Sequence, residues 1–180
     1  MRMSVLDSLK RMMRAKTNIS GVSILLLQKR FERFSTERLL LAMRRGWRQE
    51  YDPVQFFATD LEGEGAVLKV KSMFVTMQHF DRRADSQIFG NQVLPPWGEH
   101  SAYSSVAYFC PDGVAPGEQR NHFYGFLGLF CAEILSDNIS ALLFVDDQVL
   151  VRNNSSLQDS LRSGRNFDPV SFRSQQRNHS

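Results

Sequence analysis

Apolar and polar positions repeat with two different periods along the chain, which predicts both strands and helices. Apolar or alternating runs of strand length predict strands over residues 22–28, 54–58, 66–71, 73–80, 102–110 and 139–145, with a short continuation at 149–151. Apolar spacings of three and four predict helices over residues 3–16, 35–46 and 118–135. Ser155 or Ser156 would begin a further short helix that ends at Arg162.

Local signals at the second helix support its boundaries. Ser35 has the character of an N-cap, and Glu37 in the first turn suits the positive end of the helix dipole. Gly46 follows two arginines and predicts the end of the helix. In the long helix, two glycines, Gly125 and Gly128, indicate a close approach to a sheet.

The order of elements predicts an α+β fold. Two β-α-β halves would flank a β-hairpin in a mixed sheet with helices on one face, an α/β sandwich with a ferredoxin-like tendency. We expect an amphipathic N-terminal helix in residues 1–18, a single domain over 19–163, and a disordered tail over 164–180, which is rich in Arg, Asn, Ser and Gln.

The N-terminal helix is the first candidate interface. Its apolar side chains fall within one arc of the helix and include Leu9, Met12 and Met13. Basic side chains occupy the other side, so contact with a membrane surface is one reading. The helix is short and lacks Trp and Phe, so docking on its own domain or on a partner protein is favoured.

Composition and charge narrow the function classes. The formal net charge of +3 conceals a balance of +8 over residues 1–50, −8 over 51–150 and +3 over 151–180. Basic ends around an acidic centre suit nucleic acid or an anionic membrane, but they also suit one segment packing on another. The basic residues lack the interleaved aromatics of a single-strand binder, so the second reading is favoured.

Cysteine content and hydropathy bear on location. Cys110 and Cys131 both lie in apolar runs, which favours buried free thiols over a disulfide. No apolar stretch approaches the roughly 20 residues of a transmembrane span, and no apolar region follows the basic N-terminus as in a secretory signal. A cytoplasmic location is expected.

Four apolar stretches carry a family resemblance over about residues 20–160. They are residues 21–27, the hairpin strand ending at 74–77, the strand 102–109 with the aromatic helix after it, and residues 139–145. Their order resembles a bacterial stand-alone α/β domain family of unknown function. The resemblance implies a fold and transfers no functional residue.

The long segment 81–100 contains most of the candidate ligand-binding residues. Twenty residues without a period predict either a functional loop or a short helix near Ser86–Phe89. A site built from His79, Asp81, His100 and His122 would form if this loop folded over the start of the long helix, and Arg82 and Arg83 at the start of the loop could receive an anionic ligand. The ligand-binding candidates are therefore His79, Arg82, Arg83, His100 and His122. Three histidines with ordinary surface partners are the favoured alternative. No metal or cofactor is predicted, because no zinc-ligand spacing occurs.

The remaining candidate residues give weaker indications of a functional site. Ser104 and Ser105 lack the motif of a nucleophile elbow. Asp146 and Asp147 follow a strand, where sites collect but turns also form. Trp97, between Pro96 and Gly98, is a candidate interface anchor, or it plugs the loop onto the core.

The leading hypothesis is therefore a non-enzymatic interaction or regulatory domain with a protein partner or a second copy of itself. One alternative is a small-molecule-binding domain or hydrolase with a site under the 81–100 loop. Another is salt-dependent binding of nucleic acid or an anionic membrane by the basic N-terminal third.

Overall fold

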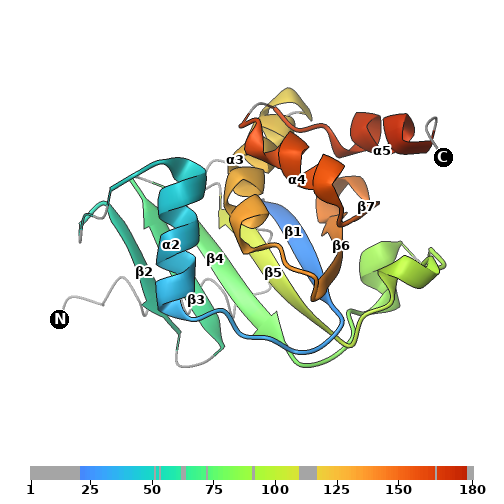
Figure 1. Ribbon diagram of the computed structural model, residues 1–180, viewed down its shortest axis with the longest axis horizontal. Helices are drawn as coiled ribbons and strands as arrows, with labels where there is room; N and C mark the ends of the chain where they lie inside the picture. Colours follow the sequence, from blue (N-terminus) through green and yellow to red (C-terminus); the bar gives the residue numbers. More distant parts are fainter. Residues whose placement is uncertain are drawn as a thin grey trace.

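The computed structural model describes residues 21–177, apart from positions 51, 53, 62–63, 72, 91, 110–116 and 165. A seven-stranded sheet with the order β2-β3-β4-β5-β1-β6-β7 forms its centre (Figure 1). The strands are β1 (Gly21–Gln28), β2 (Phe56–Asp60), β3 (Gly65–Val70), β4 (Met73–Phe80), β5 (Ala102–Phe109), β6 (Ile139–Phe144) and β7 (Val149–Arg152). The helices are α2 (Thr36–Trp47), α3 (Gly117–Ile134), α4 (Ser155–Arg162) and α5 (Pro169–Arg177). The α+β class is confirmed, whereas the predicted helix 3–16, with Leu9, Met12 and Met13, lies outside the described residues.

The predicted mixed sheet is wrong, because every strand pair within the described ranges is antiparallel. The helical connections explain the difference. α2 links β1 to β2 across three intervening strands, and α3 links β5 to β6 with β1 between them. The linked strands run in the same direction but never pair. The two β-α-β halves and the ferredoxin-like arrangement are not confirmed, whereas the β3–β4 hairpin is.

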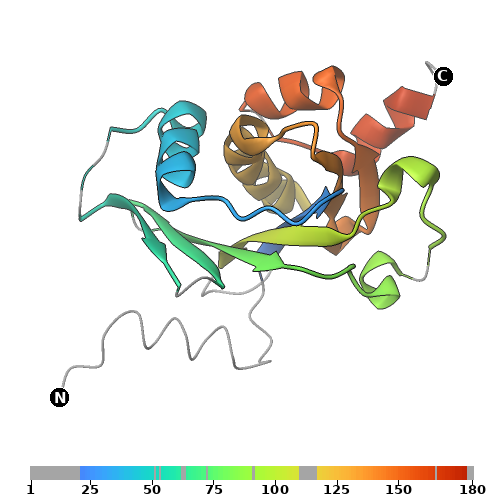
Figure 2. The same cartoon turned by 60° about the horizontal axis from the view of Figure 1, so that its bottom comes forward.

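Helices α2, α3 and α4 lie over one face of the sheet (Figure 2). The main apolar cluster fills the space between them and includes Ile24 and Leu26 of β1. Trp47 at the end of α2 stacks on Phe126 and Phe130 of α3, with ring centroids 4.7 and 5.2 Å apart. Its indole N–H donates a 2.8 Å hydrogen bond to the Phe126 carbonyl. Aromatic stacking and this hydrogen bond therefore join the two helices.

The start of α2 follows the sequence prediction, and its end differs by one residue. The Ser35 hydroxyl accepts a hydrogen bond from the Arg38 backbone N–H at 3.2 Å, as an N-cap does. The helix continues past Gly46, and Arg48 takes the left-handed conformation with φ 52°. A Cβ on Gly46 would lie 2.5 Å from the Leu129 carbonyl oxygen. Gly46 thus allows α2 and α3 to approach closely.

The opposite face carries a smaller apolar cluster under the 81–100 segment. Two 3₁₀ turns, η1 (Ser86–Phe89) and η2 (Pro96–Gly98), lie in this segment. The short helix predicted near Ser86–Phe89 is therefore confirmed as a 3₁₀ turn. Phe89 is buried against Leu27 and its neighbours, and Trp97 packs against the same cluster while half-buried.

The C-terminal residues differ from the predicted disordered tail. Pro169–Arg177 forms α5, and Asp168 before it accepts two backbone N–H groups of the first turn at 2.9 and 3.2 Å. Phe167 is 5% exposed and stacks on Phe144 at 5.0 Å between ring centroids. A cap and a buried ring thus hold α5 beside β7, the last strand of the sheet (Figure 1).

Candidate functional site

A polar cluster between the sheet and the segment before α2 contains a serine and a histidine in hydrogen-bond contact. The Ser104 hydroxyl lies 2.8 Å from His79 Nδ1. Gln28 Nε2 donates to the Ser104 hydroxyl at 3.1 Å and to the Glu32 carbonyl at 3.0 Å. Gln28 Oε1 accepts from the Glu32 N–H at 3.1 Å. We call Gln28, Glu32, His79 and Ser104 the Ser104 cluster.

Burial argues against a catalytic role for the Ser104 cluster. Gln28 and Ser104 are 0% exposed, so the hydroxyl has no access to a substrate. Burial, and then the positive charge of Arg33, lowers the pKa of His79 to about 4 despite the opposing effect of Asp60. His79 is therefore neutral at pH 7. The cluster holds the segment before α2 against the sheet.

Cys131 is also buried and has no access to a substrate. It is a buried free thiol on α3, as predicted, and burial raises its pKa to about 12. A thiolate nucleophile is therefore excluded at this position. Cys110 lies outside the described residues.

His100 has both ring nitrogens engaged by the backbone. Its Nε2 accepts from the Ala84 N–H at 3.0 Å, and its Nδ1 lies 3.0 Å from the Gly98 carbonyl oxygen. This pairing places the proton on Nδ1. Burial lowers the pKa of His100, the hydrogen bond to Gly98 opposes that effect, and the charge of Arg83 adds to it. His100 thus fastens the 81–100 segment onto itself.

The structure places the five predicted ligand-binding residues in several locations. Arg83 and His100 line one shallow cavity of about 470 Å³, together with Lys29 and Glu99. His79 belongs to the Ser104 cluster. Arg82 is exposed, with its guanidinium 5.9 Å from the centre of the Phe80 ring. His122 is exposed on α3. Only Arg83 and His100 of the five are brought to a common cavity.

The carboxylates after β6 pair within the fold. Asp147 Oδ1 accepts from Arg120 Nη1 at 2.8 Å. Asp146 Oδ2 accepts from the Tyr124 hydroxyl at 3.2 Å and from the Ser23 N–H at 3.1 Å. Burial, followed by the charges of both carboxylates, raises the pKa of Tyr124. Asp146 and Asp147 therefore anchor α3 and β1 to the end of β6.

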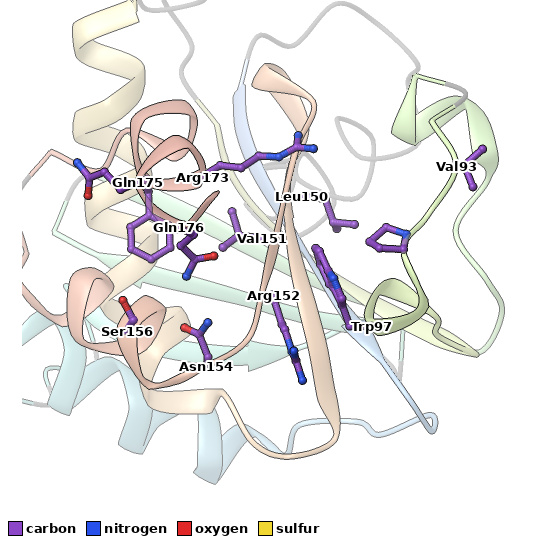
Figure 3. Close-up of a pocket in the computed structure, with 12 residues that line it drawn as sticks. Val93, Trp97, Leu150, Val151, Arg152, Asn154, Ser156, Arg173, Gln175 and Gln176 are labelled. Carbon is purple, nitrogen blue, oxygen red and sulfur yellow. The ribbon is translucent and has the colours of Figure 1, made fainter. Parts of the chain in front are cut away.

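A groove of about 890 Å³ opens along β7, and Figure 3 shows its side chains. One wall comes from the η2 segment and the other from α5. The β7 groove is lined by Val93, Pro95, Trp97, Leu150, Val151, Arg152, Asn154, Ser156, Phe172, Arg173, Gln175 and Gln176. Its volume lies in the range of ligand sites, which is about 300–1,000 Å³.

The β7 groove extends around the free edge of the sheet. Leu150 belongs to the apolar cluster under η2, whereas Val151 belongs to the cluster under the helices. Successive side chains of a strand point to opposite faces, so a groove lined by both residues reaches around the strand edge. β7 ends the strand order, which leaves that edge without a neighbouring strand within the described residues.

Hydrogen-bond alternation shows which β7 backbone groups face the groove. The Asn153 N–H donates to the Ser140 carbonyl at 3.0 Å, so this pair is of the hydrogen-bonded type. Such pairs alternate along an antiparallel ladder, which directs Val151 and Val149 toward β6. The N–H and C=O groups of Leu150 and Arg152 therefore point away from β6, toward the β7 groove.

The charge of the groove has one sign. Arg152 and Arg173 contribute guanidinium groups, and the lining residues include no Asp or Glu. Neither arginine forms an ion pair with a carboxylate of the described chain. A smaller cavity of about 50 Å³ adjoins the groove beside Trp97, and its lining combines apolar side chains such as Leu94 and Leu143 with the polar Gln92 and Arg173.

Sequence reasoning found Trp97 and missed the rest of the groove. β7 was expected only as a short continuation of the preceding strand, and α5 was assigned to a disordered tail. The tail nevertheless contained a signal, because Asp168-Pro169 is an N-cap followed by proline at the first helical position. Phe167 and Phe172 on either side supplied the apolar contacts for such a helix.

Comparison with known proteins leaves the chain without an assigned relative. No family model, no curated protein and no solved structure matches it. The resemblance to a bacterial domain family therefore stays a prediction. Over the described ranges, no group of three or more His, Cys, Asp or Glu side chains is arranged to hold a metal ion. No helix in that part of the chain has the length and apolar character needed to cross a bilayer.

Proposed function

We propose that the protein is a non-enzymatic interaction module whose β7 groove receives a segment of a partner protein. The observation that carries this proposal is the groove itself, a hollow of about 890 Å³ around a strand edge, with an aromatic side chain on each wall. The residues with catalytic character are instead engaged inside the fold. Ser104 is fully buried, and His100 has both nitrogens bonded to the backbone.

Trp97 is the anchor expected for such a site. It is half-buried, it lines the β7 groove, and it also lines the two smaller cavities of about 50 and 470 Å³. Trp and Arg are the residues most often found where binding energy concentrates in protein interfaces. Trp97, Arg152 and Arg173 bring both types to one hollow.

Selection of peptides tests the proposal. A library of random short peptides is displayed and enriched against the full chain, because interaction domains bind short segments in grooves and at sheet edges. The enriched peptides should lose binding to the Trp97→Ala and Arg173→Glu variants. They should keep binding to Arg45→Glu, whose altered side chain is exposed on α2. Failure to enrich any peptide, or binding that ignores both groove variants, would overturn the proposal.

Light scattering on the same samples separates the two kinds of partner predicted from the sequence. A monomer that binds the selected peptides has a different protein as its partner. A dimer that these peptides dissociate would identify a second copy as the natural occupant of the groove. The alternative of nucleic-acid or membrane binding rests on residues 2–16, outside the described part, and on residues 29–48. In that second stretch, Arg38 pairs with Glu32 and Arg44 with Glu50.

A further inference from the structure

The edge of β7 indicates how the partner segment would bind. Leu150 and Arg152 direct their backbone N–H and C=O groups into the groove, and the side chains of Leu150 and Val151 point to its two walls. An extended peptide offers the matching pattern of donors and acceptors. Strand addition of this kind is a general mode of peptide recognition.

We infer that the occupant of the β7 groove is an extended, acidic segment of a partner protein that pairs with β7 as an eighth strand. This inference rests on the proposed function and specifies the partner's conformation and charge. The four residues of β7 span about 14 Å at 3.4 Å per residue, which limits the paired segment to about four or five residues.

Charge determines the composition of the segment. Arg152 and Arg173 lie on the groove with no carboxylate among its lining residues. Arg152 is exposed, and its side chain points to the same wall as Leu150 and Trp97, because it lies two residues along the strand from Leu150 (Figure 3). A strand with Asp or Glu at positions near these guanidinium groups would pair with both. A lysine-rich strand would meet like charges.

The two walls determine where apolar side chains bind. On the η2 side, the cavity of about 50 Å³ beside Trp97 has room for a small side chain, to which Leu143 and Leu150 offer apolar contact and Arg173 a charged one. On the other side, Phe172 of α5 packs against the main apolar cluster that contains Val151 and offers an aromatic surface to the groove. Alternate residues of an added strand would therefore contact different walls, as side chains of a strand do.

A second copy of this chain fits the groove less well. Direct pairing of one β7 with another around a two-fold axis would place the same strand edge against itself. The seam would then gather the four guanidinium groups of Arg152 and Arg173 from both copies with no carboxylate among the lining residues, which like-charge repulsion disfavours. An acidic partner meets no such repulsion.

The test uses a synthetic peptide of alternating Glu and Val and the full chain. Binding is followed by the anisotropy of a dye on the peptide and by hydrogen exchange at the Leu150 and Arg152 amides. We expect protection of both amides and at least about a tenfold loss of affinity in the Arg152→Glu/Arg173→Glu double variant. The Arg45→Glu/Arg48→Glu variant, with both changes at exposed positions at or just after the end of α2, is the matched control, and it should bind as the parent does.

N-methylation of the peptide backbone identifies the binding mode. Methyl groups are placed one at a time along the peptide. In an added strand, only alternate N–H groups face β7, so affinity should fall at every second position and stay unchanged between them. Equal losses at all positions, or none, would overturn strand pairing. Equal binding of an alternating Lys and Val peptide would overturn the acidic preference.

The outcomes also separate this inference from the proposed function. If the Glu and Val peptide fails while library peptides bind in a Trp97-dependent way, the groove is an interaction site and the inference of an acidic strand is wrong. If neither kind of peptide binds, both proposals are wrong.

Discussion

The Ser104 cluster and the β7 groove differ in access more than in chemistry. The cluster contains a serine, a histidine and a glutamine joined by hydrogen bonds of 2.8–3.1 Å, yet Ser104 and Gln28 are 0% exposed. The groove contains no residue pair that suggests catalysis, yet it is open, contains Trp97 and has two arginines free of described ion-pair partners. The residue types associated with catalysis therefore lie in a cluster with a structural role, whereas the candidate binding site lies at the edge of the sheet along β7.

The contrast has a physical origin. A polar group inside the core must be hydrogen-bonded, because an unpaired one costs about 1–3 kcal/mol. Such clusters therefore arise wherever a strand crosses under a connecting segment, with or without a function. An open groove with unpaired charges needs no internal partner and remains available to a ligand. Changes in the cluster should affect stability, and changes in the groove should affect binding.

Replacing Gln28 should have the largest effect on stability. The Gln28→Ala variant leaves the Ser104 hydroxyl and the Glu32 N–H without their bonds to the amide. We expect a loss of about 2–3 kcal/mol in the free energy of unfolding, measured by urea titration. Gln92→Ala, a change of the same type at an exposed position, should stay within about 0.5 kcal/mol. A stable Gln28→Ala protein would contradict the structural role of the cluster.

Trp97 should contribute both to stability and to binding. Truncation in the Trp97→Ala variant removes half-buried apolar surface from the cluster under η2. We expect a loss of about 1–2 kcal/mol in unfolding free energy, together with loss of peptide binding. Val54→Ala is the control, because Val54 is 67% exposed and does not line the groove. Normal peptide affinity in the Trp97→Ala protein would show that Trp97 is only a packing residue.

Acid should weaken the fold through the Ser104 cluster. The pKa of His79 is about 4 in the folded chain, below the ordinary value of 6.5. The unfolded chain therefore binds a proton first, so stability is full above about pH 6.5 and falls as the pH drops toward 4. We expect about 1 kcal/mol of this loss from His79, because its ring is partly solvated. Urea titrations at several pH values measure it.

The His79→Gln variant isolates this contribution. The lowered pKa of His100 acts in the same pH window, so the parent will retain some acid sensitivity from that residue. The difference between parent and variant should grow smaller as the pH falls. If the difference in unfolding free energy between parent and variant did not change with pH, the acid sensitivity would arise from a group other than His79.

Reversing the charge of Arg173 should have the smallest effect on the fold. Its guanidinium forms no ion pair with a described carboxylate, so the Arg173→Glu variant should unfold within about 0.5 kcal/mol of the parent. Its affinity for an acidic peptide should nevertheless fall. Calorimetric unfolding beside a peptide titration checks both results. A large loss of stability would show that Arg173 contributes to the fold as well as to the groove.

Local sequence signals predicted most helices and strands, but they did not predict which segments distant in sequence lie side by side. Ser35 gave the start of α2 correctly, and the alternation over residues 66–71 gave β3. The strand order could not be predicted, because nothing in the sequence near β1 shows that β5 and β6 lie on its two sides. The groove depends on this order and combines residues from 93–97, 150–156 and 172–176. Its signals in the sequence were Trp97 and the Asp168-Pro169 cap before α5, and only the first was used.

The thiol of Cys131 can serve as a chemical probe of how often the core opens. It lies fully inside the main apolar cluster on α3, and its pKa of about 12 keeps it protonated at neutral pH. An alkylating reagent can reach it only during transient exposure, so the rate of modification counts those events. In a Cys110→Ser background this rate would report how often α3 separates from the sheet. It would also show whether a peptide bound at β7 reduces the frequency of local opening in the main apolar cluster under the helices.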